Sequence, residues 1–94
     1  MKFAIIYRPK DPPPPDQMPE MLKGMATWMQ TYGNRVEGVN FFVGGGGFGT
    51  IETDDAGELT KMISEHPFSI YSEVEVKALV DPAAALGILQ EAYG

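Results

Sequence analysis

The chain has 94 residues, no cysteine, and a formal net charge of −6 from 7 Lys and Arg against 13 Asp and Glu. This length fits one domain, residues 1–94, and the missing thiols exclude disulfides, thiolate metal sites and a cysteine nucleophile. The acidic balance argues against nucleic acid and anionic membranes as partners, and no apolar stretch is long enough to cross a membrane. The opening apolar run is too short for a signal peptide, so we expect a cytoplasmic protein.

A first strand is predicted from Lys2 to Arg8, because this run is rich in β-forming residues and ends before a proline. Both of its faces are apolar, with Phe3, Ile5 and Tyr7 alternating with Ala4 and Ile6. A strand that is apolar on both faces is buried on both sides. This pattern is the first indication that both faces of the sheet are covered.

Six prolines between Pro9 and Pro19 exclude a helix or central strand, and we expect an extended connector, with a docking strip for a proline-recognising partner as the alternative. An amphipathic helix follows, with Asp16 as its expected N-cap and Gly33-Asn34 as its stop. Its apolar stripe is Met18, Met21, Leu22, Met25, Trp28, Met29 and Tyr32. The spacing is typical of a helix packed on a core, and the methionines also suit a ligand-binding groove.

Two strands, Val36 to Val43 and Phe48 to Thr53, are predicted on either side of four glycines, Gly44 to Gly47. Glycine-rich loops can bind phosphate, but such a loop needs a following helix and usually a Lys-Ser or Lys-Thr pair. A strand follows here and the pair is missing. The glycines therefore indicate a hairpin or a bulge.

A second helix is expected after Asp54, with Asp55 as N-cap and Glu58 at the spacing of a capping box. The adjacent acids could suggest a metal site, but no further ligands cluster near them. His66-Pro67 ends this helix. The paired acids are therefore interpreted as a helix cap.

The last strand is predicted from Ile70 to Val80, where apolar residues alternate with polar ones. One face carries Tyr71, Glu73, Glu75 and Lys77. We expect the charged members to form a salt-bridge row. Asp81-Pro82 then begins a C-terminal helix, because a capping residue is followed by proline at the first helical position.

The element order β, α, β, β, α, β with a further helix is the split βαβ (ferredoxin-like) arrangement. We predict an α+β fold with the first two helices on one face of a four-stranded antiparallel sheet, in strand order 4-1-3-2. The other face would carry apolar groups from the first two strands, joined by Tyr71 and, depending on register, Phe41. Two such faces packed together would form a two-fold homodimer.

Residues Met62 to Leu79 resemble the C-terminal half of muconolactone isomerase: a helix end, a turn with proline and an aromatic residue, then a strand of the Glu-Val-Glu-Val type. The opening strand and proline-rich entry to the first helix are also similar, so the resemblance covers roughly residues 1 to 80. It implies a dimeric α+β barrel, often built into larger rings, with a pocket inside the barrel or between sheet and helices. It also implies a proton shift in a small lactone. The hairpin Phe42 to Gly49 departs from the family, which has basic and polar residues there.

Two residues are candidate catalytic groups. Glu52 lies on the third predicted strand, where a carboxylate facing a closed barrel would have a raised pKa and could act as a general base. At an exposed strand end it would instead face solvent. His66 is the only histidine, and it could transfer protons near neutral pH or cap helix carbonyls.

Candidate ligand-binding residues are Tyr7, Arg8, Phe41 and Tyr71. Arg8 could hold a carboxylate by two-point contact, or pair with a surface acid such as Asp11. Trp28 is expected to anchor the first helix in the core. One histidine without cysteine provides no metal-ligand set, and no dinucleotide fingerprint is present, so we expect neither a metal nor a cofactor.

Two functions remain open on the sequence alone. The first is an oligomeric protein that binds a small apolar or lactone-like molecule in a pocket, with at most an isomerase-like proton transfer. The second is a non-catalytic dimeric interaction or regulatory module. In both, the expected partner is a second copy of the chain, as a dimer or a larger ring.

Overall fold

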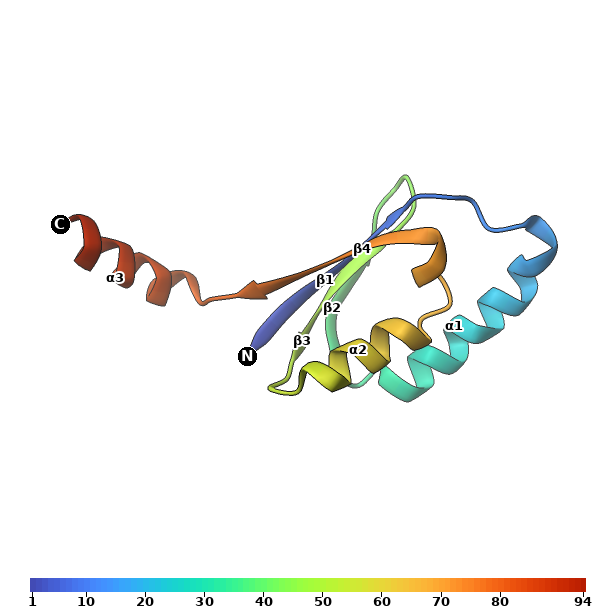
Figure 1. Cartoon of the computed structure of the whole chain (residues 1–94), viewed down its shortest axis with the longest axis horizontal. Coiled ribbons are helices and arrows are strands. Elements are labelled where there is room, and N and C mark those ends of the chain that lie inside the picture. The colour runs from blue at the N-terminus through green and yellow to red at the C-terminus, as the bar shows by residue number, and fades with distance from the viewer.

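The computed structural model describes all 94 residues and has four strands and three α-helices (Figure 1). The strands are β1 (Lys2–Pro9), β2 (Val36–Phe41), β3 (Gly47–Glu52) and β4 (Ser72–Leu79), and the helices are α1 (Met18–Tyr32), α2 (Ala56–Glu65) and α3 (Pro82–Tyr93). Short 3₁₀ turns at Pro15–Gln17 and Ser69–Tyr71 precede α1 and β4. The predicted element order is confirmed.

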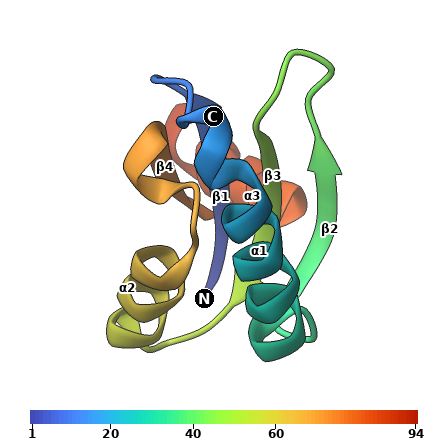
Figure 2. The ribbon, with the colours of Figure 1, turned by 90° about the vertical axis from the view of Figure 1, so that its right-hand side faces the viewer.

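The strands form one antiparallel sheet in the order β2-β3-β1-β4, as predicted. β1 is central, and its Ile5 lies opposite Gly49 of β3 and Val76 of β4. Helices α1 and α2 lie on the same side of the sheet, in front of it in Figure 2. The ferredoxin-like α+β fold class is therefore confirmed.

The glycine segment closes the hairpin between β2 and β3, but β2 ends at Phe41 rather than at Val43. The backbone N–H of Phe42 donates to the carbonyl of Gly46 at 2.8 Å, which turns the chain back early. Gly46 has a φ of +80°, and a Cβ atom there would collide with the carbonyl oxygen of Tyr7. The hairpin therefore packs against the end of β1 through a position that needs glycine.

The fourth strand begins at Ser72 rather than at Ile70, because the three residues before it form a 3₁₀ turn. The backbone N–H of Tyr71 donates to the carbonyl of Phe68 at 3.1 Å. This turn removes Ile70 and Tyr71 from the alternation of the strand. The prediction that Tyr71 joins the open face of the sheet is wrong, and Tyr71 lines a cavity on the helix side.

Two of the predicted helix caps are present. Asp55 caps α2 by accepting from the N–H of Gly57 at 2.8 Å, and Asp81 caps α3 by accepting from the N–H of Ala84 at 3.2 Å. Both helices therefore begin where a local sequence signal places them.

The prediction of Asp16 as the cap of α1 is wrong. The proline segment is an irregular connector as far as Pro14 and then forms the 3₁₀ turn Pro15–Gln17, which contains Asp16. Gln17 occupies the N-cap position with helical dihedral angles and no side-chain hydrogen bond. A capping side chain needs an extended backbone at its own position, and the 3₁₀ turn leaves none.

A small core lies between the sheet and α2. It consists of Ile5, Ile51, Leu59 and Met62, with further half-buried side chains packed around it. Helix α1 joins this core through Trp28, whose Nε1 donates to the carbonyl of Met62 at 2.9 Å. Trp28 therefore anchors α1, as predicted.

The sheet face opposite the helices carries a row of charged side chains along β4 and the end of β1. Glu75 pairs with Arg8 at 2.9 Å and with Lys77 at 3.6 Å. The predicted salt-bridge row is confirmed for these residues. The arginine holds the pKa of the Glu75 carboxyl below its usual range.

The apolar part of this open face is smaller than predicted. Ile6 lies opposite Phe48, and the ring of Phe42 packs against Phe48 with centroids 5.7 Å apart. Phe41 lies opposite Gly47, which in turn lies opposite Tyr7. Phe41 is therefore on the helix side, and its predicted contribution to the open face is wrong.

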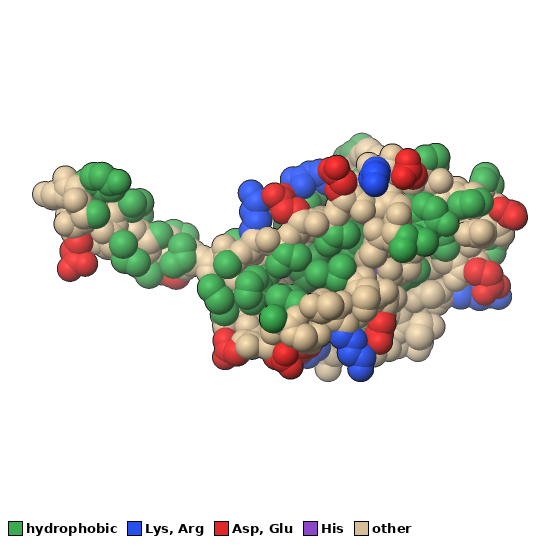
Figure 3. Space-filling view, viewed as in Figure 1, with side chains coloured by type: hydrophobic (Ala, Val, Ile, Leu, Met, Phe, Trp, Pro, Cys, Tyr) green, Lys and Arg blue, Asp and Glu red, His purple; other side chains and the backbone are tan.

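Helix α3 projects away from the rest of the chain beyond the end of β4 (Figure 1), and none of its residues is buried. The chain spans 58 Å in its longest direction, and its Cα radius of gyration is 16.0 Å. A compact domain of this length would have a radius of about 12 Å. Figure 3 shows hydrophobic side chains along this projecting helix. No helix of the chain is both long and apolar enough to cross a membrane.

Candidate functional site

A cavity of about 530 Å³ lies on the helix side of the sheet, beneath α1, and opens to solvent. Its wall combines side chains from several elements, including Ile5 of β1, Val36 of β2, Met25 and Trp28 of α1, and Met62 of α2. Trp28 attaches α1 to α2 at the carbonyl of Met62, and the cavity lies between these helices and the strands. This apolar cavity is the candidate site.

The apolar stripe of α1 has both of the roles that its sequence suggested, packing in the core and lining a ligand-binding groove. Met21 is buried and Trp28 attaches the helix to α2, which is the core role. Leu22, Met25 and Met29 line the cavity, which is the groove role. Methionine side chains are unbranched and adapt to irregular shapes, so this wall can conform to a bound molecule.

His66 lies in the cavity wall, directly after α2. Its ring stacks on Tyr7 with centroids 4.2 Å apart and meets the ring of Trp28 edge-on at 4.9 Å. Its Nδ1 accepts a hydrogen bond from the backbone N–H of Phe68 at 3.2 Å, so the ring does not cap helix carbonyls. An accepting Nδ1 carries no proton, which places the proton of the neutral ring on Nε2.

Burial lowers the pKa of His66 to about 4. The imidazole is therefore neutral at pH 7. It has one N–H donor, at Nε2, and no protein group accepts from it. His66 is thus a neutral hydrogen-bond donor in the wall of an apolar cavity.

Tyr7 is fixed by hydrogen bonds within the protein. The hydroxyl of Ser69 donates to the carbonyl of Ile63 at 2.6 Å, so its oxygen is left to accept from the hydroxyl of Tyr7, 3.2 Å away. Burial raises the pKa of Tyr7. Tyr7 therefore stays protonated and presents its ring to the cavity.

Two other predicted ligand-binding residues also line the cavity. Tyr71 donates its hydroxyl to Oε1 of Gln17 at 3.1 Å, which joins the turn before β4 to the start of α1. Phe41 lies at the rim and is 79 % exposed. The structure thus brings Tyr7, Phe41 and Tyr71 to one cavity with His66.

Arg8 and Glu52 lie away from the cavity. Arg8 is on the opposite face of the sheet, where it pairs with Glu75 rather than with Asp11. Glu52 ends β3 with its side chain 72 % exposed, and its Oε1 is 3.3 Å from the amino nitrogen of Met1. The solvent-facing alternative considered for Glu52 is the one observed, so an enclosed carboxylate base is absent from this position.

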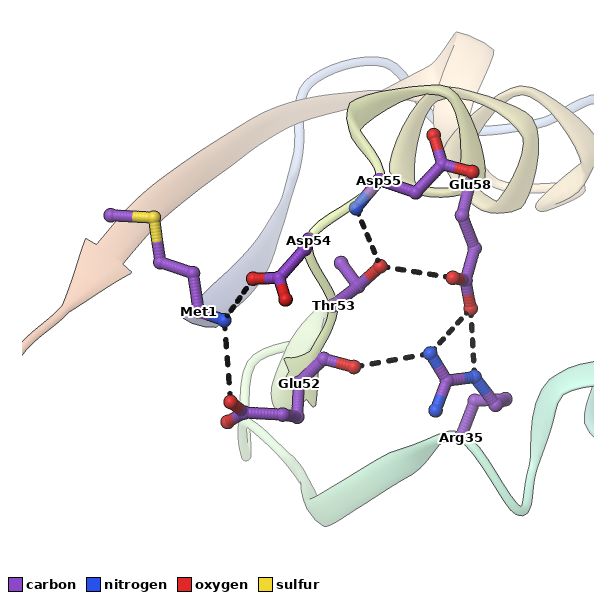
Figure 4. A network of polar contacts seen from close by, with 7 residues as sticks. All are labelled: Met1, Arg35, Glu52, Thr53, Asp54, Asp55 and Glu58. Carbon is purple, nitrogen blue, oxygen red and sulfur yellow. Dashed lines mark hydrogen bonds and ion pairs between the residues drawn. The ribbon is translucent and has the colours of Figure 1, made fainter.

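Figure 4 shows that the residues after Glu52 form a structural network. Arg35 donates from Nε to Oε1 of Glu58 at 2.7 Å and lowers the pKa of that carboxyl. The other Glu58 oxygen accepts from the hydroxyl of Thr53 at 2.9 Å, and Thr53 accepts from the N–H of Asp55 at 3.0 Å. The predicted capping box is thus bridged by Thr53, and the acids serve the start of α2.

Two residues that the sequence did not indicate as ligand-binding also line the cavity. Asp11, in the irregular proline connector, and Phe68, in the turn after α2, both line it. Neither residue belongs to a periodic element, so no spacing could have placed it there. The structure has no group of three or more His, Cys, Asp or Glu side chains that could hold a metal ion.

Fold and site together define a small ferredoxin-like α+β domain with an apolar cavity between its sheet and its helices. The chain belongs to the family described as Domain of unknown function (DUF3303), which it matches over residues 1–93. A search of curated proteins finds no match.

Among solved structures, the chain is similar to 5-chloro-2-hydroxyhydroquinone dehydrochlorinase (TftG) from Burkholderia phenoliruptrix AC1100, in complex with 2,5-dihydroxybenzoquinone. The TM-score is 0.59 and the sequence identity is 16 %, over 89 % of this chain and 98 % of that one. This likeness supports the fold. The resemblance to muconolactone isomerase is not confirmed by these matches.

Proposed function

We propose that this protein binds a small, uncharged ring compound that carries a hydrogen-bond acceptor oxygen. The observation that carries the proposal is the cavity wall, which is apolar except for a few groups, with the neutral His66 among them. Its volume of about 530 Å³ lies within the usual range of ligand pockets, about 300 to 1,000 Å³.

The charge of the cavity wall supports an uncharged ligand. No lysine or arginine lines the cavity, and the one acid that does is Asp11. The charged form of an anionic ligand would lose hydration without gaining a cationic partner. The compound in the TftG complex, 2,5-dihydroxybenzoquinone, is a small ring with carbonyl oxygens, which supports the ring shape and the acceptor oxygen of the proposed ligand.

The donor at His66 supports an acceptor oxygen on the ligand. The Nε2–H of His66 has no acceptor within the protein, so it can donate to a carbonyl or ether oxygen that enters the cavity. Because Nδ1 is already occupied, the ring is better placed to donate than to remove a proton. Binding is therefore favoured over an isomerase-like proton shift, which in this cavity would fall to His66 rather than to Glu52.

We also propose that the protein forms a homodimer, which the sequence predicts. The open sheet face, with Ile6, Phe42 and Phe48, supports an interface, although charged residues share that face. Sedimentation at several concentrations measures this directly. A protein that stays monomeric at micromolar concentration would contradict it.

Ligand binding is tested by thermal shift and calorimetry with three matched probes: 2-acetylnaphthalene, naphthalene and naphthalene-2-carboxylate. We expect the ketone to raise the melting temperature most and the carboxylate least. His66→Phe should weaken the binding of the ketone by about 3- to 10-fold, because one hydrogen bond is lost, and should leave the binding of naphthalene unchanged.

A blocking variant shows where the probes bind. Met29→Trp places a large ring into the cavity, whereas Gln30→Trp adds the same ring at an exposed position of α1 outside it. The first should abolish ketone binding and the second should preserve it. Absent binding, or binding that Met29→Trp leaves intact, would overturn the proposal.

A further inference from the structure

Helix α3 is an apolar element without a partner in its own chain. Its exposed large hydrophobic residues are Leu86, Ile88, Leu89 and Tyr93. Its 12 residues include one charged side chain, Glu91. A helix of this length is marginal in water by itself, because most helix stability comes from packing an apolar face. Something must cover α3 for it to be stably folded.

The family match includes α3, which favours a second copy of this domain over a separate domain as its cover. The match to the DUF3303 family runs over residues 1–93 and therefore includes α3. The start of α3 is also defined by a cap, Asp81, followed by Pro82. Helix α3 is therefore part of the domain that the family match covers, and a second copy of that domain is a partner that the protein itself supplies.

The opposite end of the molecule has a matching apolar surface. It comprises Phe41, Phe42 and Val43 at the hairpin and Ile70 in the turn before β4, and we name it the hairpin end. Ile70 is 80 % exposed. Strand register places this end opposite to α3: Pro9 pairs with Ser72 at one end of the sheet, and Lys2 pairs with Leu79 at the other.

Charge also favours contact between these two surfaces. The segment Phe41 to Gly49 has no charged residue, and α3 has one. Two copies of a chain with net charge −6 repel each other, so association is least opposed where uncharged surfaces meet. Other exposed faces carry ion pairs, as at Arg8 with Glu75.

We propose that α3 of one copy packs on the hairpin end of a second copy, and that the second α3 makes the same contact in return. A two-fold axis across the strands places each α3 against the far end of its partner, so both apolar surfaces of both chains are covered. Phe41 and Tyr71 line the cavity near this end, so the partner helix closes part of its rim. This inference rests on the proposed self-association but not on ligand binding.

The contact is tested first by cross-linking, because the chain has no cysteine of its own. A Leu89→Cys/Val43→Cys variant should form a covalent dimer on mild oxidation, and peptide mass spectrometry should find position 89 joined to position 43. The matched variant Leu89→Cys/Thr27→Cys, with its second cysteine on α1, should form no 89–27 link. Equal 89–27 and 89–43 linkage would overturn the proposal.

Sedimentation provides the second test. Leu89→Glu should weaken the dimer at least tenfold, while Gln90→Glu, the same charge one residue along the exposed helix, should leave it unchanged. Circular dichroism at 222 nm confirms that the body remains folded. A native monomer would overturn self-association itself, whereas a native dimer that Leu89→Glu leaves intact would overturn only the role of α3.

Discussion

The imidazole of His66 lies nearly parallel to the phenol ring of Tyr7, with ring centroids 4.2 Å apart and planes inclined by 22°. The stack joins the segment after α2 to the central strand of the sheet. A charged imidazolium would have to be accommodated in this half-buried place, between Tyr7 and the edge of Trp28. The protonation of His66 is therefore coupled to the stability of the fold.

Stability should fall on acidification because of His66. The folded pKa is about 4 and the ordinary value is 6.5, so between these values the unfolded chain binds the proton more readily. The contribution of the neutral His66 to folding stability is complete above about pH 6.5, decreases below that pH and is lost as the pH falls through about 4. We expect the difference in unfolding free energy between the native protein and His66→Phe, measured in urea at several pH values, to become smaller towards low pH.

Both proteins contain the same carboxylates, so the effect of carboxylate titration on stability cancels when the native protein is compared with the variant. A single imidazole resonance followed by NMR measures the pKa directly, because the chain has one histidine. A midpoint near 6.5, or a gap that does not change with pH, would contradict this prediction.

Removing the hydroxyl of Thr53 should destabilise the protein. Thr53 is buried, and its oxygen links the N–H of Asp55 to the carboxylate of Glu58. Thr53→Val leaves both groups without that partner and should cost about 1 to 2 kcal/mol of unfolding free energy in urea. Thr50→Val is the matched control, because the Thr50 hydroxyl donates to the carbonyl of Glu37 at an exposed position. Equal losses in the two variants would argue against the bridge.

Two neighbouring glycines should respond differently to alanine. Gly46→Ala forces a side chain into a φ of +80° and against the carbonyl of Tyr7, so it should cost about 1 to 3 kcal/mol. Gly44 has open space around it and no positive φ. Gly44→Ala should be neutral or stabilise by about 0.4 to 1 kcal/mol, because it restricts the unfolded chain. The melting temperatures of the two variants test this prediction, and similar values for Gly46→Ala and Gly44→Ala would contradict it.

Much of the fold could be predicted because it depends on local and periodic signals. The alternation in β1 and β4 and the caps at Asp55 and Asp81 act within a few residues of themselves. Asp16 and Tyr71 were misplaced for one shared reason. In each case a 3₁₀ turn replaced the expected backbone, and no residue pattern distinguishes such a turn from the element that follows it.

The candidate site was harder to predict because it depends on tertiary spacing. His66 and Tyr7 are 59 positions apart in the chain and meet only through the packing of α2 on the sheet. Glu52 was on the expected strand, but at the strand end, where its carboxylate reaches solvent. The distance between α1 and the sheet, which creates the cavity, is determined by the size and angle of packed side chains and has no signature in hydrophobic periodicity.

The wall of the cavity contains the only tryptophan of the chain, Trp28, whose indole N–H is already bonded to the carbonyl of Met62. Its fluorescence therefore comes from one known place, with one known hydrogen bond. Water leaving the cavity, or a ring entering it, changes the polarity around this indole and shifts its emission. The protein thus contains its own optical reporter of occupancy, and an unlabelled sample suffices to screen for the molecule that fills it.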